Sequence, residues 1–210
     1  MHPDLFSIGG FVIHTYGVCI AVGFLLSLLL CMRLRKYAGM TKDQVSDVCI
    51  IAILTGFLGA RLLYILLHWE SLDHAFSELF NFRKPGFVFY GGFILAILCV
   101  MLYARRKGIG VLALLDILGP SIALAHAFGR VGCLMAGCCF GAPAPAWAAP
   151  FATVFPAGSM PALAHPSFSG KSLPLHSTQI LECGLNLLIC AGLCLVLKKT
   201  NRRGVSAGLY

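Results

Sequence analysis

Long apolar runs alternate with short polar segments along this chain. A helix that crosses the hydrocarbon core of a bilayer needs about 20 mostly apolar residues. Five runs approach or exceed this length, so the pattern predicts an all-α, polytopic membrane bundle of about five transmembrane helices. The predicted spans lie near Phe11–Met32, Val48–Trp69, Phe87–Tyr103, Val111–Phe128 and Thr178–Leu197.

The composition agrees with a membrane protein. Of the 210 residues, 59% are hydrophobic and 11% are charged, compared with a charged share of roughly a quarter in soluble domains. We expect one transmembrane domain over residues 1–210, with no second domain. An extramembrane loop at about residues 140–177 is expected between the last two spans, because proline and alanine recur there and argue against regular helix.

The net charge of +8 first suggests a nucleic-acid partner, but the membrane explains the placement of the cations better. Most of them follow the first, third and fifth spans, which share one side if the spans alternate. The positive-inside rule then predicts an outer N-terminus, a cytoplasmic C-terminus and no nucleic acid. No cation precedes the first span, so we expect that span to remain as an anchor. The three clusters are Arg33, Arg35, Lys36 and Lys42; Arg105, Arg106 and Lys107; and Lys198, Lys199, Arg202 and Arg203.

Arg130 lies in a G-R-V-G-C segment just beyond the fourth predicted span. Charged groups at membrane depth are costly and therefore call for an explanation. The glycines on either side allow a bulky ligand to approach, and a guanidinium matches a phosphate with two parallel hydrogen bonds. Arg130 is thus a candidate anion-binding residue. The alternative is an arginine that extends to the interface without a functional role.

Arg61 and Tyr64 are one helical turn apart in the second span and share a face. A structural ion pair between Arg61 and an intramembrane carboxylate, such as Glu182 or Asp116, is as good an explanation as a ligand site. Tyr90 precedes Gly91 and Gly92 at the membrane boundary, where a structural interfacial tyrosine is the default.

A third polar group lies at the start of the last span, where His176, Gln179 and Glu182 recur every three residues. This spacing places the three side chains on one face of a helix start. Ser177 or Thr178 is suited to cap that helix.

The order of five short segments resembles the prolipoprotein diacylglyceryl transferase family over essentially the whole chain. Each segment alone is a weak signal, but their order and their placement on successive spans make the match specific. The segments are H-T-Y-G at 14–17, G-A-R-L-L-Y at 59–64, F-Y-G-G at 89–92, G-R-V-G at 129–132 and L-H-S-T-Q-I-L-E at 175–182.

The resemblance implies a transferase in the bacterial cytoplasmic membrane. Such an enzyme moves the diacylglyceryl group of phosphatidylglycerol onto the lipobox cysteine thiol of a prolipoprotein, the first step of lipoprotein maturation, and needs no cofactor. Arg130 would bind the lipid phosphate and stabilise charge on the leaving group, with Glu182 orienting an arginine. The implied substrate-binding residues are Arg130, Tyr16, Arg61, Tyr64, Gly91, Gly92, Gly129, Gly132, Gln179 and Glu182.

The chain departs from the family pattern in three places. Tyr90 replaces the usual histidine, and an ordinary tyrosine pKa of about 10 makes a poor base at neutral pH. Tyr90, His14 and His176 therefore remain alternative catalytic groups beside Arg130. Cys133, Ala136 and Cys138 replace Asn, Asn and Glu. The chain also ends near the start of a further family helix, so it is expected to be C-terminally short, and an inactive homologue is an alternative.

Cys133, Cys138 and Cys139 lie in a glycine-rich segment, whereas the other seven cysteines lie in apolar runs. The three support a second hypothesis, a membrane thiol-redox or metal-handling protein, through a disulfide or a metal shared with His165 or His176. Their spacing matches no common zinc pattern, so we predict no metal. A third hypothesis is a small channel or transporter lined by Arg61, Asp116 and Arg130.

Overall fold

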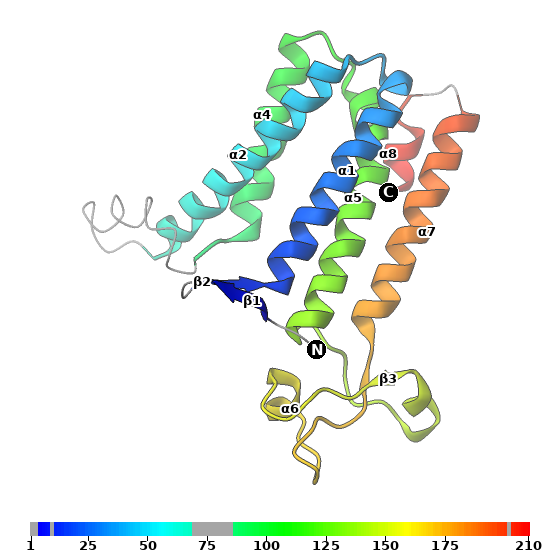
Figure 1. The fold of residues 1–210 in the computed structure, drawn as a ribbon. Helices are drawn as coiled ribbons and strands as arrows, with labels where there is room; N and C mark the ends of the chain where they lie inside the picture. Colours follow the sequence, from blue (N-terminus) through cyan, green and yellow to red (C-terminus); the bar gives the residue numbers. More distant parts are fainter. Residues whose placement is uncertain (1–3, 9–10, 69–85, 201–202) are drawn as a thin grey trace. The chain divides into compact units, whose positions relative to one another are not determined.

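The computed structural model describes residues 4–8, 11–68, 86–200 and 203–210. Within these residues, five helices are long and apolar enough to cross a membrane (Figure 1). The predicted all-α class with about five spans is therefore confirmed, whereas the orientation of the termini stays a prediction. The five helices are α1 (Thr15–Ala38), α2 (Lys42–Leu67), α4 (Phe89–Arg106), α5 (Val111–Ala136) and α7 (Thr178–Lys199).

Two helix boundaries, the start of α1 and the end of α5, differ from the predicted ones. Helix α1 begins at Thr15, because the preceding segment forms strand β2 (Phe11–His14), which pairs antiparallel with strand β1 (Asp4–Ile8). The β-branched residues of β2 suit a strand as well as a span. Helix α5 continues past Phe128 to Ala136, so Arg130 and Cys133 lie on a helix. The predicted end of the second span, Trp69, and the cation Arg202 lie outside the described residues.

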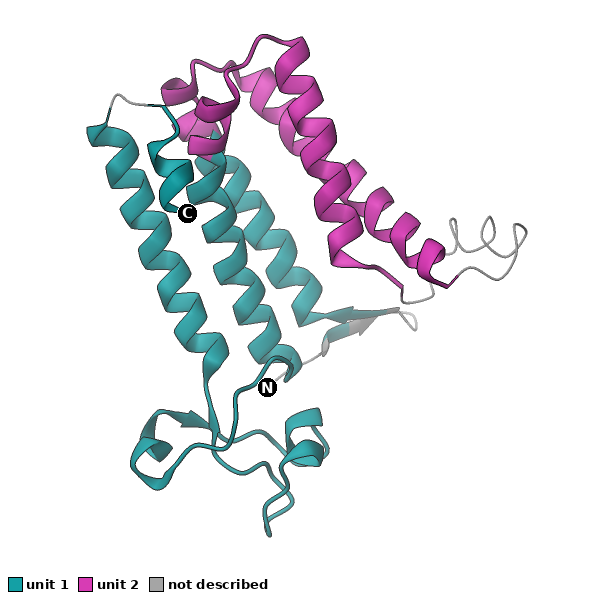
Figure 2. Cartoon of the chain, turned by 180° about the vertical axis from the view of Figure 1, so that it is seen from behind, with its two compact units in different colours: residues 1–31, 118–210 teal, residues 32–117 magenta. Residues whose placement is uncertain are grey.

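The chain falls into two compact units, residues 1–31 with 118–210 and residues 32–117 (Figure 2). The expectation of a single domain stays a prediction. Within the unit of residues 32–117, α2 and α4 pack closely against each other because glycines face glycines. A Cβ added to Gly91 would collide with the backbone of Gly59, and one added to Gly92 with the backbone of Gly56. Small residues let membrane helices approach in this way.

The other unit contains β1, β2, most of α1, α5 from residue 118, the connection to α7, and α7 itself. Close packing of α1 on α5 requires Gly23, since a Cβ there would lie 2.6 Å from Phe128 Cβ. The unit ends with the short helix α8 (Val205–Leu209).

The connection between α5 and α7 has short regular elements: the 3-10 helix η1 (Ala146–Phe151), strand β3 (Ala152–Thr153), helix α6 (Met160–Ala164) and strand β4 (Leu175–His176). Phe155 and Leu175 are fully buried within it. Ser172 donates its backbone N–H to Phe155 O at 3.0 Å and accepts the Phe155 N–H at 2.8 Å. Because β4 leads directly into α7, this connection fixes where α7 begins.

Candidate functional site

Arg130 and Glu182 form an ion pair between α5 and α7. Arg130 Nη2 lies 2.6 Å from Glu182 Oε2, and both side chains are partly exposed. The backbone carbonyl of Glu182 also accepts a hydrogen bond from Asn186 Nδ2 at 2.8 Å. The expectation that Glu182 orients an arginine thus has a direct geometric counterpart, in Arg130.

One Glu182 oxygen does not satisfy the whole guanidinium. Among the residues that the structure describes, Arg130 Nε is buried and has no hydrogen-bond partner. A buried, unpaired donor costs roughly 1–3 kcal/mol. An oxygen-rich anion bound at Arg130 would remove this cost, which makes the position suitable for a phosphate.

Tyr16 lies against the same part of α5. A Cβ added to Gly132 would come within 3.0 Å of Tyr16 Cδ2 and 3.2 Å of Cys19 Cβ, so glycine allows the ring to lie close to α5. Gly129 makes an ordinary contact, since a Cβ there would lie 3.7 Å from Ile20.

Side chains at the start of α7 donate hydrogen bonds to the turn that follows α5. Gln179 is almost completely buried, and its Nε2 donates to Cys138 O at 2.8 Å. Thr178 Oγ1 donates to Cys139 O, also at 2.8 Å. Gly141 packs closely against β4, since a Cβ added to it would lie 2.8 Å from His176 Cβ. Gln179 therefore acts on the site through the backbone of its neighbours.

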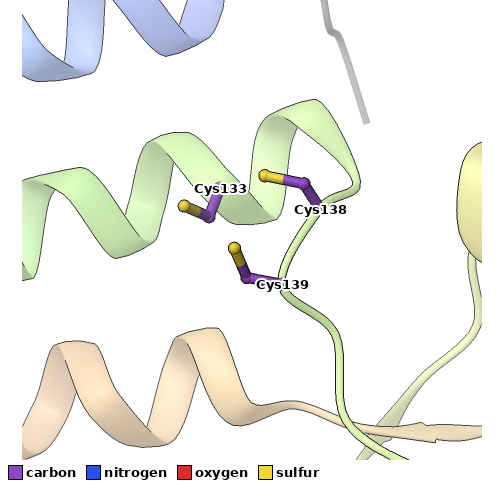
Figure 3. A group of neighbouring side chains, drawn as sticks. All are labelled: Cys133, Cys138 and Cys139. Carbon is purple, nitrogen blue, oxygen red and sulfur yellow. The ribbon is translucent and has the colours of Figure 1, made fainter. Parts of the chain in front are cut away.

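The three cysteines after Arg130 meet at this turn (Figure 3). The Sγ atoms of Cys133, Cys138 and Cys139 all lie within 4.8 Å of one another, and none of them forms a disulfide. Burial raises the pKa of the Cys138 thiol. Sequence reasoning singled out the three cysteines as a disulfide or metal candidate but could not show that their sulfurs meet, because the backbone turn that closes the cluster involves Cys139 at a φ of 58°, which no local motif signals.

Arg61 belongs to the unit of residues 32–117 and is almost fully buried. Its Nη1 donates to Gly86 O at 2.9 Å. Its guanidinium lies 5.5 Å from the ring centres of both Tyr64 and Phe87. These contacts tie α2 to the segment that enters α4, so Arg61 and Tyr64 have a clear structural role. A substrate-binding role for them stays a prediction.

Tyr90 lies in the first turn of α4 and is largely exposed, with its ring 5.8 Å from that of Phe89. The two glycines after it, Gly91 and Gly92, are used in packing against α2, as described above. Their predicted contact with substrate is untested, as is the catalytic role of Tyr90.

The two candidate histidines differ in their surroundings. His14 is the last residue of β2, directly before α1, and it is exposed. His176 is exposed on β4, where its backbone bonds to Gly141 and Ala142. The structure thus brings Arg130, Glu182 and Tyr16 together, with both histidines in the same unit.

The fold and these contacts define a polytopic membrane protein with an arginine–carboxylate pair suited to an anionic headgroup. The family model of prolipoprotein diacylglyceryl transferases matches residues 3–210. The chain belongs to this family. Five apolar helices and this membership place it in the bacterial cytoplasmic membrane as a multi-pass protein.

Several relatives carry the same name. The chain is 35% identical to the phosphatidylglycerol–prolipoprotein diacylglyceryl transferase of Clostridium tetani, over 100% of this chain and 80% of the relative. It is 31% identical to the second such enzyme of Clostridium perfringens, over 100% of this chain and 78% of the relative. A relative in Bacillus mycoides is 38% identical over 61% of this chain and 48% of its own length.

Proposed function

We propose that the protein transfers the diacylglyceryl group of phosphatidylglycerol to the lipobox cysteine of a prolipoprotein. Membership of the family and the names of its relatives support this activity. The observation that carries it at the level of residues is the Arg130–Glu182 pair, with its buried and unpaired Arg130 Nε.

The reaction makes one bond and breaks one bond. The cysteine sulfur attacks the glyceryl carbon that bears the phosphate, a thioether forms, and the carbon–oxygen electron pair leaves with glycerol phosphate. Negative charge therefore grows on a phosphate oxygen in the transition state. The Arg130 guanidinium binds the phosphate and offsets that charge, which is the usual source of large rate effects in such sites.

Glu182 fixes the direction of the guanidinium, and Tyr16, Gly129, Gly132 and Gln179 shape its surroundings. By the family pattern, Arg61, Tyr64, Gly91 and Gly92 are further candidate contacts of the lipid headgroup. Among the side chains of this chain, Tyr90, His14 and His176 are the candidates for a base that takes the thiol proton. Phosphatidylglycerol, the prolipoprotein signal peptide and the surrounding lipids are the partners.

Family membership favours this activity over the other two functions considered, a thiol-redox or metal-handling protein and a channel. Each alternative remains distinguishable by experiment. A channel would pass ions across a liposome without any lipid product, and a redox protein would exchange thiols and disulfides without consuming phosphatidylglycerol.

The test is mass spectrometry of a lipobox peptide incubated with the purified protein and phosphatidylglycerol. The peptide cysteine should gain a diacylglyceryl mass. Arg130→Ala should reduce the transfer rate by about 100-fold or more. Arg130→Lys should retain only part of the wild-type rate, because lysine lacks the paired donors. Arg105→Ala, at an exposed arginine in the last turn of α4, is the matched control. Full activity in Arg130→Ala would refute the assignment.

A further inference from the structure

We propose that Cys133, Cys138 and Cys139 hold one zinc ion whose fourth ligand is the thiol of the substrate cysteine. The inference rests on the proposed transfer and says how its nucleophile is activated. It departs from the expectation, based on sequence spacing alone, that the chain binds no metal.

The first argument is the geometry of the three sulfurs, which lie within 4.8 Å of one another (Figure 3). Zinc–sulfur bonds of about 2.3 Å in a tetrahedral site place sulfurs about 3.8 Å apart. The three sulfurs would therefore draw slightly closer together on binding the ion. The sulfurs form no disulfide with one another, so all three are available as ligands.

The second argument is that hydrogen bonds at the end of α5 and from α7 hold the backbone of the three cysteines in place. Cys133 lies in the last turn of α5, and the Cys138 N–H donates to its carbonyl at 3.0 Å. Gln179 and Thr178 on α7 fix the carbonyls of Cys138 and Cys139.

Cys139 has a φ of 58° and is the only non-glycine residue with a positive φ among the described residues. A left-handed conformation costs a residue with a Cβ roughly 1–2 kcal/mol. This strained turn places the third sulfur beside the other two.

The number of ligands indicates the kind of site. Structural zinc sites have four protein ligands, whereas catalytic sites have three and leave one position for water or substrate. Within the described residues, the group that could hold a metal contains these three cysteines and no fourth residue. Cys139 is exposed, so an incoming thiol has access to the open position.

The cluster also has the right position for the proposed reaction. Cys133 follows Arg130 by three residues on α5, and residues at this spacing are neighbours on a helix surface, with Cβ atoms about 5–6 Å apart. Tyr16 lies against Gly132, the residue directly before Cys133, since a Cβ added to Gly132 would be 3.0 Å from Tyr16 Cδ2. A sulfur bound at the cluster would therefore lie beside the residue that binds the phosphate.

The chemistry balances without an oxidant or a reductant. The substrate thiol binds Zn²⁺ as a thiolate and releases its proton to water, as coordinated thiols do. The thiolate then attacks the glyceryl carbon. The sulfur–carbon bond forms, the carbon–oxygen bond breaks, and glycerol phosphate leaves with the electron pair. A thioether is a weaker zinc ligand than a thiolate, so the product dissociates.

This mechanism would explain how the enzyme works with Tyr90 in place of the family histidine. Because Zn²⁺ lowers the pKa of a bound thiol, no strong base is needed near the substrate. Cys133 and Cys138, two of the proposed zinc ligands, are also the residues that replace the asparagine and the glutamate of the family pattern.

The first experiment measures metal binding without any turnover. The full chain, purified in detergent, reduced and stripped with a chelator, is titrated with Co²⁺, whose visible spectrum reports thiolate ligands, and then with Zn²⁺ as competitor. We expect one ion per chain, lost in Cys133→Ser and kept in Cys99→Ser, a control on α4. Thermal unfolding of both variants shows whether they are folded. No stoichiometric binding by the reduced wild-type chain would overturn the inference.

The second experiment adds a lipobox peptide to the Co²⁺ form. A fourth thiolate should raise the charge-transfer absorbance by about one third, and a peptide with serine in place of cysteine should leave it unchanged. An unchanged spectrum with the cysteine peptide would overturn substrate ligation.

The third experiment separates this inference from the proposed function. In the mass-spectrometric assay, stripping zinc should reduce the transfer rate at least about tenfold, and added Zn²⁺ should restore it. Transfer at the rate of the untreated wild type, both by the stripped enzyme and by Cys133→Ser, would overturn the zinc mechanism while the transferase stands. Absence of transfer with zinc bound and the peptide thiol ligated would instead count against the proposed function alone.

Discussion

Arg130 on α5 and Glu182 on α7 form an ion pair in which Arg130 Nη2 lies 2.6 Å from Glu182 Oε2. The pair has two opposing effects on an anionic lipid. Glu182 fixes the guanidinium in one direction, which favours the transition state, but its negative charge repels the phosphate in the ground state. These effects act on different kinetic constants, so they can be separated by mutation.

Glu182→Gln should lower kcat by about five- to tenfold and leave KM for phosphatidylglycerol unchanged or lower. The amide removes the ion pair, worth about 1 kcal/mol or slightly more at a partly exposed site, and also removes the repulsion. Steady-state kinetics at several lipid concentrations measure both constants. Glu182→Asp, which keeps the charge on a shorter side chain, is the matched control and should lose less. A rise in KM at constant kcat would contradict this division of roles.

The helices were accessible from sequence because they depend on a strong local signal, whereas the sequence left open which arginine Glu182 orients and offered Arg61 as its ion-pair partner, not Arg130. Apolar runs of membrane length predict spans, and an arginine and a glutamate at membrane depth need partners. The end of α5 was placed eight residues too early, because glycines and Arg130 interrupt the apolar run after Phe128 while the helix continues. Polar residues at a helix end do not by themselves stop a helix.

The cysteine cluster was not accessible in the same way. It depends on the left-handed conformation of Cys139 and on hydrogen bonds from Gln179 and Thr178, residues far along the chain. The packing role of Gly91 was hidden for a similar reason, since it depends on the facing position of Gly59. Both features arise from contacts between segments that no short motif records.

Gln179→Met should destabilise the protein and disturb the turn after α5. The substitution keeps the volume of a buried side chain but removes the hydrogen bond to Cys138 O, which costs about 1 kcal/mol and lowers the melting temperature by about 2–4 °C. Thermal unfolding in detergent measures the shift. Ile180→Met, at an exposed neighbour on α7, should leave the melting temperature unchanged. Equal shifts in the two variants would show that the hydrogen bond contributes nothing specific.

Gly59→Ala and Gly56→Ala, two substitutions three residues apart on α2, should have opposite effects. A Cβ at Gly59 would meet the backbone of Gly91 and lie 2.7 Å from Leu95 Cβ, whereas one at Gly56 would meet nothing within 4 Å. Gly59→Ala should therefore push α2 and α4 apart and lower the melting temperature by several degrees. Gly56→Ala should be neutral or stabilising by up to about 1 kcal/mol, because alanine is the better helix former. Equal tolerance of both would argue against close α2–α4 packing.

Cys139→Gly should stabilise the fold and weaken zinc binding at the same time. Glycine adopts a positive φ without the steric cost that Cys139 pays at 58°. Part of the gain is offset by the greater freedom of glycine in the unfolded chain, so the melting temperature should rise by about 2 °C. Loss of one of three thiolates should nevertheless lower Zn²⁺ affinity at least about tenfold. Cys139→Ser separates the two effects, because it retains the strained backbone and loses the same ligand. A strained residue that lowers stability while completing a site is expected where function requires it, so a glycine variant that kept its zinc affinity would show that the third sulfur is not a ligand.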